Sequence, residues 1–151
     1  MHAPDRVHTV DDYYDGPRGG VADFRGEPHQ YRSIYLDGPS WHPDEDRFHL
    51  TPISRTVRDL AIERFRLWQR WQTASLQGTV GELAPDAPRI LKEDLAAFVT
   101  IEAAIAAEYA HPTGPVLLVR GSFSQSGVDE GPLGGLTVYW EVVEVASAAG
   151  K

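Results

Sequence analysis

Two long segments in the middle of the chain carry the apolar spacing of amphipathic helices, and they constrain the fold more than any other feature. Segment 54–77 repeats apolar residues three to five positions apart, while its charged residues lie mostly on the opposite side. Pro52 just before this segment and Gly78 just after it are typical helix boundaries. A second helix is predicted over 89–110. The middle of the chain is therefore predicted to be a pair of consecutive helices.

Strand-like segments flank this helical pair. Segments 20–25 and 29–36 surround a turn that contains Gly and Pro, which predicts a hairpin. The apolar run 116–119 favours a buried central strand, and alternation over 136–143 predicts a second strand within a C-terminal hairpin, 116–145. The order β-β-α-α-β-β predicts an α+β fold: a two-layer arrangement in which an antiparallel sheet of about four strands carries two helices on one face.

The chain length suits one domain over residues 1–151. Within it, residues 1–19 are expected to form an N-terminal arm or loop, because they are polar and rich in turn residues. Residues 37–46 combine Pro, Gly and Asp at a density that no regular element tolerates, and they are predicted to form a surface loop.

The absence of cysteine excludes several classes of chemistry. Disulfides, thiolate nucleophiles, cysteine-ligated zinc and iron–sulfur clusters all require this residue. The His, Asp and Glu residues of segment 42–49 match no metal-binding spacing, and the glycine-rich runs 16–20 and 131–135 match no phosphate-binding pattern. The serines in 122–126 do not form a hydrolase nucleophile elbow. We therefore expect no metal and no cofactor, and the sequence assigns no catalytic residue.

The formal net charge of −8 bears on the partners of the protein. A chain this negative is repelled by phosphate backbones and anionic lipids, which disfavours nucleic acid and membranes as partners. Residues 1–14 lack the basic start and apolar run of a secretory signal, and the low-charge run 95–107 is too short to span a bilayer. The expected localisation is cytoplasmic.

The segment 12–29 is the strongest candidate for binding. Acidic, aromatic and basic residues are crowded there beside Gly and Pro, as in binding loops held by a hairpin, although an ordinary turn and hairpin has the same composition. In the polar loop that follows, a tryptophan marks a candidate contact surface. The candidate binding residues are Asp12, Tyr14, Asp15, Arg18, His29, Tyr31 and Trp41. Trp68 and Trp71, set among arginines, either fill the core or form a binding platform.

The run DYYDGPRGGVADFRGEPHQY (residues 12–31), the LTPIS that precedes the first helix, the W-x-x-W within it and the closing LTVYW resemble a group of small bacterial proteins. Those proteins open with a DYYDGP-type segment followed by a GxAxxxGxPH hairpin. The likeness covers most of the chain, and residues 12–29 are its specific part. It implies a compact, non-secreted bacterial protein. Because no activity is established for the group, the resemblance transfers no catalytic residue.

These observations favour a small acidic cytoplasmic protein that binds a macromolecular partner. The expected partner is a protein, in an accessory, regulatory or immunity-type role, and a basic partner would be steered by the acidic surface. A homodimer is a further possibility, formed through an exposed strand edge at 116–119 or 136–145.

Two other functions follow from different residues. The first is a small-molecule-binding protein or minor enzyme, with a pocket between sheet and helices that uses His29 with Asp15, Asp23 or Tyr31. The second is nucleic-acid binding through the arginine-rich first helix, which the overall charge disfavours.

Overall fold

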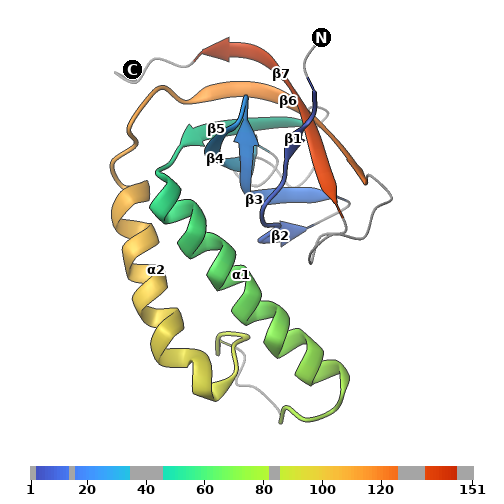
Figure 1. Cartoon of the computed structure of the whole chain (residues 1–151), viewed down its shortest axis with the longest axis vertical. Helices are drawn as coiled ribbons and strands as arrows, with labels where there is room; N and C mark the ends of the chain where they lie inside the picture. The colour runs from blue at the N-terminus through green and yellow to red at the C-terminus, as the bar shows by residue number, and fades with distance from the viewer. Residues whose placement is uncertain (1–2, 14–15, 35–45, 82–85, 126–134, 146–151) are drawn as a thin grey trace.

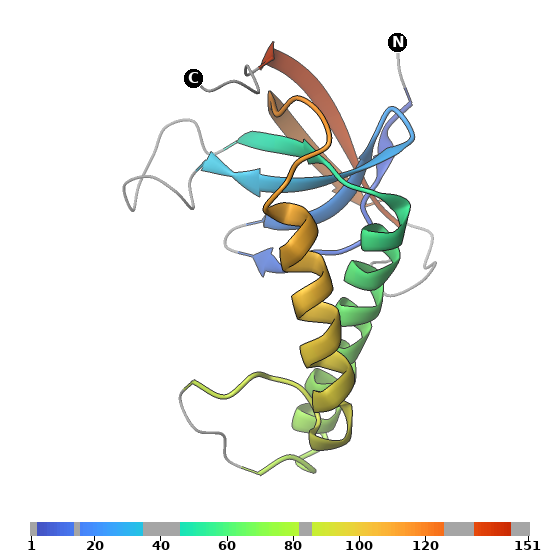
Figure 2. The same cartoon turned by 90° about the vertical axis from the view of Figure 1, so that its left-hand side faces the viewer.

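The computed structural model describes residues 3–13, 16–34, 46–81, 86–125 and 135–145. A strongly curled sheet occupies one end of the molecule, and two long helices extend from it side by side (Figures 1 and 2). The N-terminal strand lies across the open side of the curl.

The sheet has seven antiparallel strands in the spatial order β1-β7-β6-β5-β4-β3-β2 (Figure 1). The strands are β1 (Asp5–Arg6), β2 (Asp12–Tyr13), β3 (Pro17–Phe24), β4 (Glu27–Ser33), β5 (Arg47–Pro52), β6 (Leu117–Gln125) and β7 (Leu136–Val145). Segment 116–119 thus contributes to β6, an internal strand between β5 and β7, while β7 lies near one end of the sheet.

One N-terminal segment contacts both ends of this sheet. Asp5 in β1 pairs with Val138 of β7. Two residues later, Val7 pairs with Ala22 of β3. Further along, the backbone N–H of Asp11 donates to a β3 carbonyl at 2.8 Å. This single segment therefore draws the two ends of the sheet toward each other and makes it a half-barrel.

The predicted four-stranded, two-layer sheet is wrong. Two of the additional strands, β1 and β2, lie in the 1–19 segment that was expected to be an arm, and each has only two residues, too few for an alternating pattern. The third, β5, alternates Phe48 and Leu50 with polar residues, but it is only six residues long and lies just before the start of a helix. With seven strands the sheet curls around its own core, so the helices do not cover one flat face.

The hairpin of β3 and β4 turns through Arg25 and Gly26, whose φ angles are 53° and 81°. Two consecutive residues with positive φ are the signature of a type I′ turn, which matches the twist of antiparallel strands. The carboxylate of Asp5 accepts hydrogen bonds from both backbone N–H groups, at 3.1 and 3.2 Å. The N-terminal segment thereby holds this turn in place.

The helices are α1 (Arg55–Leu76) and α2 (Leu95–Tyr109), the latter preceded by a short 3₁₀ turn. Ser54 caps α1 by accepting the N–H of Val57 through its hydroxyl oxygen. Glu108, at the end of α2, accepts hydrogen bonds from both the backbone N–H and the hydroxyl of Ser54, each at 2.7 Å. The end of one helix thus holds the start of the other.

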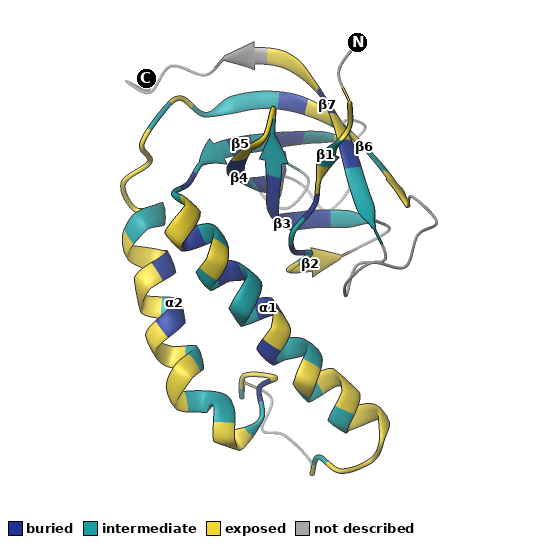
Figure 3. Ribbon diagram, viewed as in Figure 1, coloured by how far each residue is buried: buried dark blue, intermediate teal, exposed yellow. Residues whose placement is uncertain are grey.

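Buried residues form two cores (Figure 3). The first lies inside the curled sheet and centres on four aromatic rings whose centroids are 5.5 to 6.0 Å apart: Tyr31, Phe48, Phe123 and Trp140. The second joins the helices to the outer side of the sheet, where Val21 of β3 packs with residues of α1 and α2. Trp68 packs against this second core and stacks on Phe65, so it is a packing residue.

No helix in the described part of the chain is long and apolar enough to cross a membrane.

Candidate functional site

The structure describes four of the seven candidate binding residues, and one of these four is exposed. Tyr14, Asp15 and Trp41 lie outside the described residues. Asp12 is exposed on β2, whereas Arg18 on β3 is buried. The remaining two candidates, on β4, are also buried, and their contacts show what they do.

Tyr31 supports the crossing of the N-terminal segment over the sheet. Its ring belongs to the aromatic core, and its hydroxyl donates a 2.9 Å hydrogen bond to the backbone oxygen of Thr9. Burial raises the pKa of Tyr31 well above its usual value. This tyrosine is therefore a neutral structural donor.

His29 makes local contacts. Its Nδ1 lies 2.9 Å from the backbone oxygen of Glu27, and its ring meets Phe24 edge-on at 5.5 Å. The carboxylate of Asp23 lies 2.9 Å from a different histidine, His8. In the described part of the chain, His29 thus lacks the carboxylate partner that an acid–base pair at this position requires.

A polar cluster joins the N-terminal segment to the helices. Arg64 of α1 forms ion pairs with two carboxylates. Its guanidinium nitrogens lie 2.7 Å from a carboxylate oxygen of Glu102 on α2 and 3.5 Å from a carboxylate oxygen of Asp11. Burial raises the pKa of Asp11 to about 6, despite the opposing effect of Arg64. Burial likewise raises the pKa of Tyr109 to about 12. The cluster fixes the helices to the sheet at the cost of a partly desolvated carboxylate.

We expect Asp11→Asn to stabilise the protein at neutral pH. A folded-state pKa above the unfolded value means that stability falls as pH rises from about 4 to 6 and stays lower above that range. The Asp11 side chain is 27% exposed, so the expected gain is reduced to about 1 to 2 kcal/mol at pH 7.5, vanishing near pH 4. Urea unfolding at both pH values measures this gain.

Asp59→Asn, at an exposed carboxylate of α1, controls for the loss of one negative charge. The free energies of unfolding of Asp11→Asn and the wild type should differ more at pH 7.5 than at pH 4. An equal difference at both pH values would contradict the raised pKa of Asp11.

The second candidate site is the outer edge of β7. On this edge β1 pairs with Thr137 and Val138 only, and the described residues place no strand beside β7 from Tyr139 onward. The pairing between β1 and β7 ends at Asp5 and Val138 in the described residues. Among the described residues, more than half of β7 therefore has no strand paired with it on this edge.

The direction of the free backbone groups follows from the pairing. The carbonyl of Leu136 accepts the N–H of Val7, so the backbone groups of Leu136 face β1. Backbone groups of alternate residues in an antiparallel strand point to the same side. The N–H and C=O groups of Trp140 and Val142 therefore point out from the open edge.

The side chains at this edge are apolar on both faces of the sheet. On the outer face, Tyr139 is 44% exposed and Val143 is 43% exposed. Val142 follows Val138 and Trp140 on the inner face, but it is 39% exposed, because the curl is open there. An exposed apolar edge strand is a template for pairing with another chain.

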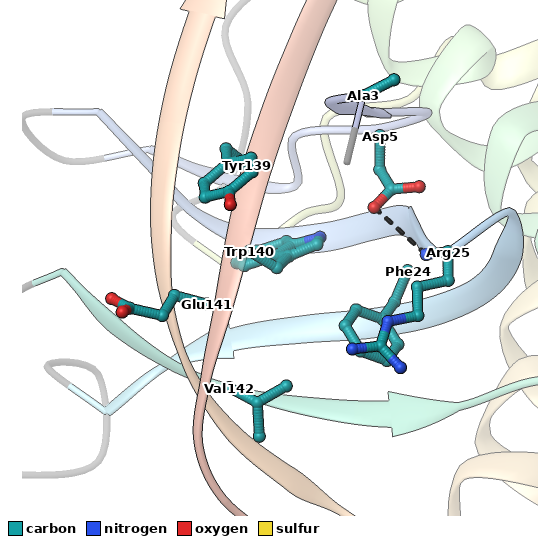
Figure 4. A pocket seen from close by; sticks show the side chains of 8 residues that line it. All are labelled: Ala3, Asp5, Phe24, Arg25, Tyr139, Trp140, Glu141 and Val142. Atoms are coloured by element: carbon teal, nitrogen blue, oxygen red, sulfur yellow. Dashed lines mark hydrogen bonds between the residues drawn. The ribbon is translucent and has the colours of Figure 1, made fainter. Parts of the chain in front are cut away.

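A hollow of about 200 Å³ lies beside the edge (Figure 4). The side chains of Trp140, Phe24 and Val142 provide its apolar surface, and Asp5 and Arg25 provide its polar groups. The indole N–H of Trp140 donates to the backbone oxygen of Asp23 at 3.0 Å, which holds this ring in place. The hollow is thus a preformed aromatic recess with charged groups around it.

Arg25 brings a positive charge to this hollow, whereas the carboxylate of Glu141 points away from Arg25 on the other side of β7 (Figure 4). The guanidinium of Arg25 lies 4.9 Å from the centre of the Phe24 ring, in a cation–π contact. Among the described residues neither side chain forms an ion pair. Both charges are thus without an oppositely charged partner in this part of the chain.

The sequence left 116–119 and 136–145 as alternative pairing edges for a homodimer, and it did not indicate the hollow. Phe24 and Arg25 lie more than a hundred residues from Trp140, and only the curl of the sheet brings them together. The one local signal is the pair Val142 and Val143, two consecutive valines where a strand with one solvent-facing side carries a polar residue.

Within the described ranges, no three His, Asp or Glu side chains gather as a metal site. Comparisons of the chain with protein family profiles, with curated proteins and with solved structures find no match.

Proposed function

We propose that this protein binds an extended segment of a partner protein, which adds to the sheet as a new strand beside β7. The observation that carries this proposal is the open edge of β7, apolar on both faces and bordered by an aromatic hollow. In strand addition, backbone hydrogen bonds provide affinity and pockets for alternate side chains provide specificity.

The backbone of β7 offers the first of these contributions. The outward N–H and C=O groups of Trp140 and Val142 match the spacing of an antiparallel strand. They belong to a strand that β6 already holds in register from Leu136 to Val142, with a register shift at Val143, so little ordering of the chain is needed on binding.

The side chains at the edge offer the second contribution. Every second side chain of an added strand would point inward, toward Trp140 and Val142 at the hollow. The others would lie on the outer face, next to Tyr139 and Val143. Apolar side chains on both faces of the bound segment would cover surface that is now in contact with water.

Charge favours a partner with basic residues. The chain carries a net charge of −8, and Glu141 lies on the outer face of β7 within this edge. Such a surface speeds the approach of a basic partner and disfavours an acidic one. The proposed partner is therefore a basic protein in the cytoplasm. The protein would bind it in an accessory, regulatory or immunity-type role.

Peptide selection against the wild-type protein tests the proposal. Heptapeptides selected from a random library are titrated by calorimetry into the wild type and into Val142→Lys. We expect Val142→Lys to weaken binding at least tenfold, because a charged edge residue opposes strand pairing. N-methylation of alternate peptide bonds should have a similar effect, because it removes the backbone donors of the peptide.

Val99→Lys is the matched control, since Val99 is an exposed valine on α2, away from the sheet. It should leave the affinity unchanged. Selected peptides that bind Val142→Lys as well as the wild type would overturn the proposal. A wild-type dimer that Val142→Lys converts to monomer would also overturn it, by assigning the edge to a second copy of this chain.

A further inference from the structure

We infer that the segment received by β7 is the free C-terminal end of its partner and that Arg25 binds its terminal carboxylate. This inference rests on the strand addition proposed above, and it names the chemistry of the segment.

The first argument is the direction of the open edge. β1 lies on the same side of β7 and runs antiparallel to it, with Asp5 opposite Val138. An antiparallel strand added beside residues 139–145 would run in the direction of β1 and meet its start at Ala3. Because β1 already occupies the rest of the edge, the added strand must stop there. A chain terminus fits this position better than a continuing chain, and in an antiparallel strand that terminus is the C-terminal one.

The second argument is the position of Arg25. Both Ala3 and Arg25 line the hollow that borders the edge, so the guanidinium lies close to the place where the added strand would end (Figure 4). Arginine is a natural carboxylate receptor, because its planar group can donate two parallel hydrogen bonds to the two oxygens.

The third argument is the backbone of Arg25. It is the one residue other than glycine with a positive φ among the described residues, at 53°. Glycine, asparagine and aspartate adopt this conformation more readily than arginine does. The turn itself has no need of an arginine, since the Asp5 carboxylate holds it through backbone N–H groups. Binding of a carboxylate gives the arginine side chain a role that the turn does not.

The guanidinium of Arg25 is held in position by an aromatic ring, without an ion pair in the described residues. It lies over the ring of Phe24. The nearby Asp5 carboxylate already accepts two hydrogen bonds from the turn backbone. A carboxylate that arrives with the ligand therefore meets an oriented cation, while an apolar side chain near the end of the segment enters the recess formed by Phe24 and Trp140.

Fluorescein-labelled heptapeptides with alternating apolar residues and one lysine test the inference. Each sequence is made with a free C-terminal carboxylate and as the C-terminal amide. By fluorescence anisotropy we expect the amides to bind the wild type about tenfold or more weakly. Arg25→Asn should weaken binding of the acids by a similar factor and remove the difference between acid and amide. Asparagine tolerates the positive φ, so the turn should be kept.

Arg25→Lys should recover part of the binding, because it restores the charge without the planar fork. Arg66→Asn, at an exposed arginine on α1, is the matched control and should change nothing. Thermal unfolding of each variant checks that the fold is intact.

Three results separate the two proposals. Acids and amides that bind equally, but still lose affinity in Val142→Lys, would overturn the carboxylate inference and leave strand addition standing. Amides that end in Asp or Glu and bind as tightly as free acids, in an Arg25-dependent way, would overturn the terminal assignment in favour of a side-chain carboxylate. Absence of any peptide whose binding is sensitive to Val142→Lys would overturn the strand addition itself.

Discussion

Gly20→Ala is expected to destabilise the fold by about 3 kcal/mol or more. A Cβ atom at this position would lie 2.3 Å from the backbone oxygen of Thr9 and 2.9 Å from the hydroxyl oxygen of Tyr31. Neither atom can move freely, because Tyr31 is fully buried and donates its hydrogen bond to that same Thr9 oxygen. The N-terminal segment would be pushed off β3 at the point where it crosses the sheet.

Urea denaturation of Gly20→Ala and of the wild type measures the loss. Gly81→Ala is the matched control, because a Cβ at Gly81 meets nothing within 4 Å. The control should change the free energy of unfolding by less than about 0.5 kcal/mol. Equal stabilities for the two variants would show that the segment does not cross β3 as closely as described.

Phe48→Ala is expected to lower stability by about 3 to 5 kcal/mol. Phe48 is 2% exposed, and its ring packs against Tyr31, Phe123 and Trp140 inside the curled sheet. Alanine would leave a cavity among rings that are held by strands on all sides. Because hydrogen bonds fix Tyr31 and Trp140 to the N-terminal half of the chain, the site cannot collapse to fill the space.

Val99→Ala, at an exposed residue of α2, serves as the control for Phe48→Ala in the same urea titration. A loss below about 1 kcal/mol in Phe48→Ala would mean that the inner side of the sheet is not a packed core. A large loss in both variants would instead indicate that the denaturation does not report on this core.

The helices and the β3–β4 hairpin could be predicted because their signals are local. An apolar repeat over twenty residues specifies α1, and the turn at Arg25 and Gly26 is marked by glycine between two strand-like runs. The segments β1 and β2 could not be predicted in this way. They are strands only because β7 and β3 lie beside them. A sequence of two residues is too short to show a pattern that would predict this pairing.

The open edge of β7 could not be predicted either, because it also depends on contacts between distant parts of the chain. Crowded polar and aromatic residues between positions 12 and 31 suggested a binding surface, but Tyr31 and His29 point into the protein and make structural contacts. The order of the strands in the sheet decides which strand has an open edge, and the composition of a segment does not reveal this order. The conspicuous Gly20 reflects steric need, since a side chain there would clash with the backbone of the N-terminal segment, whereas at Gly19 the close atom is the end of the exposed Asp12 side chain.

The N-terminal segment that contacts both ends of the sheet has a consequence for how the chain folds. Asp5 pairs with Val138, so the ladder between β1 and β7 cannot form until β7 has been synthesised. Closing so long a loop is entropically costly and slow. During synthesis the β3–β4 hairpin and the helices can form from local contacts, while the aromatic interior stays incomplete until Trp140 arrives. Closure of the half-barrel is therefore a late step relative to the local elements, and the growing chain exposes its apolar interior until β7 has been synthesised.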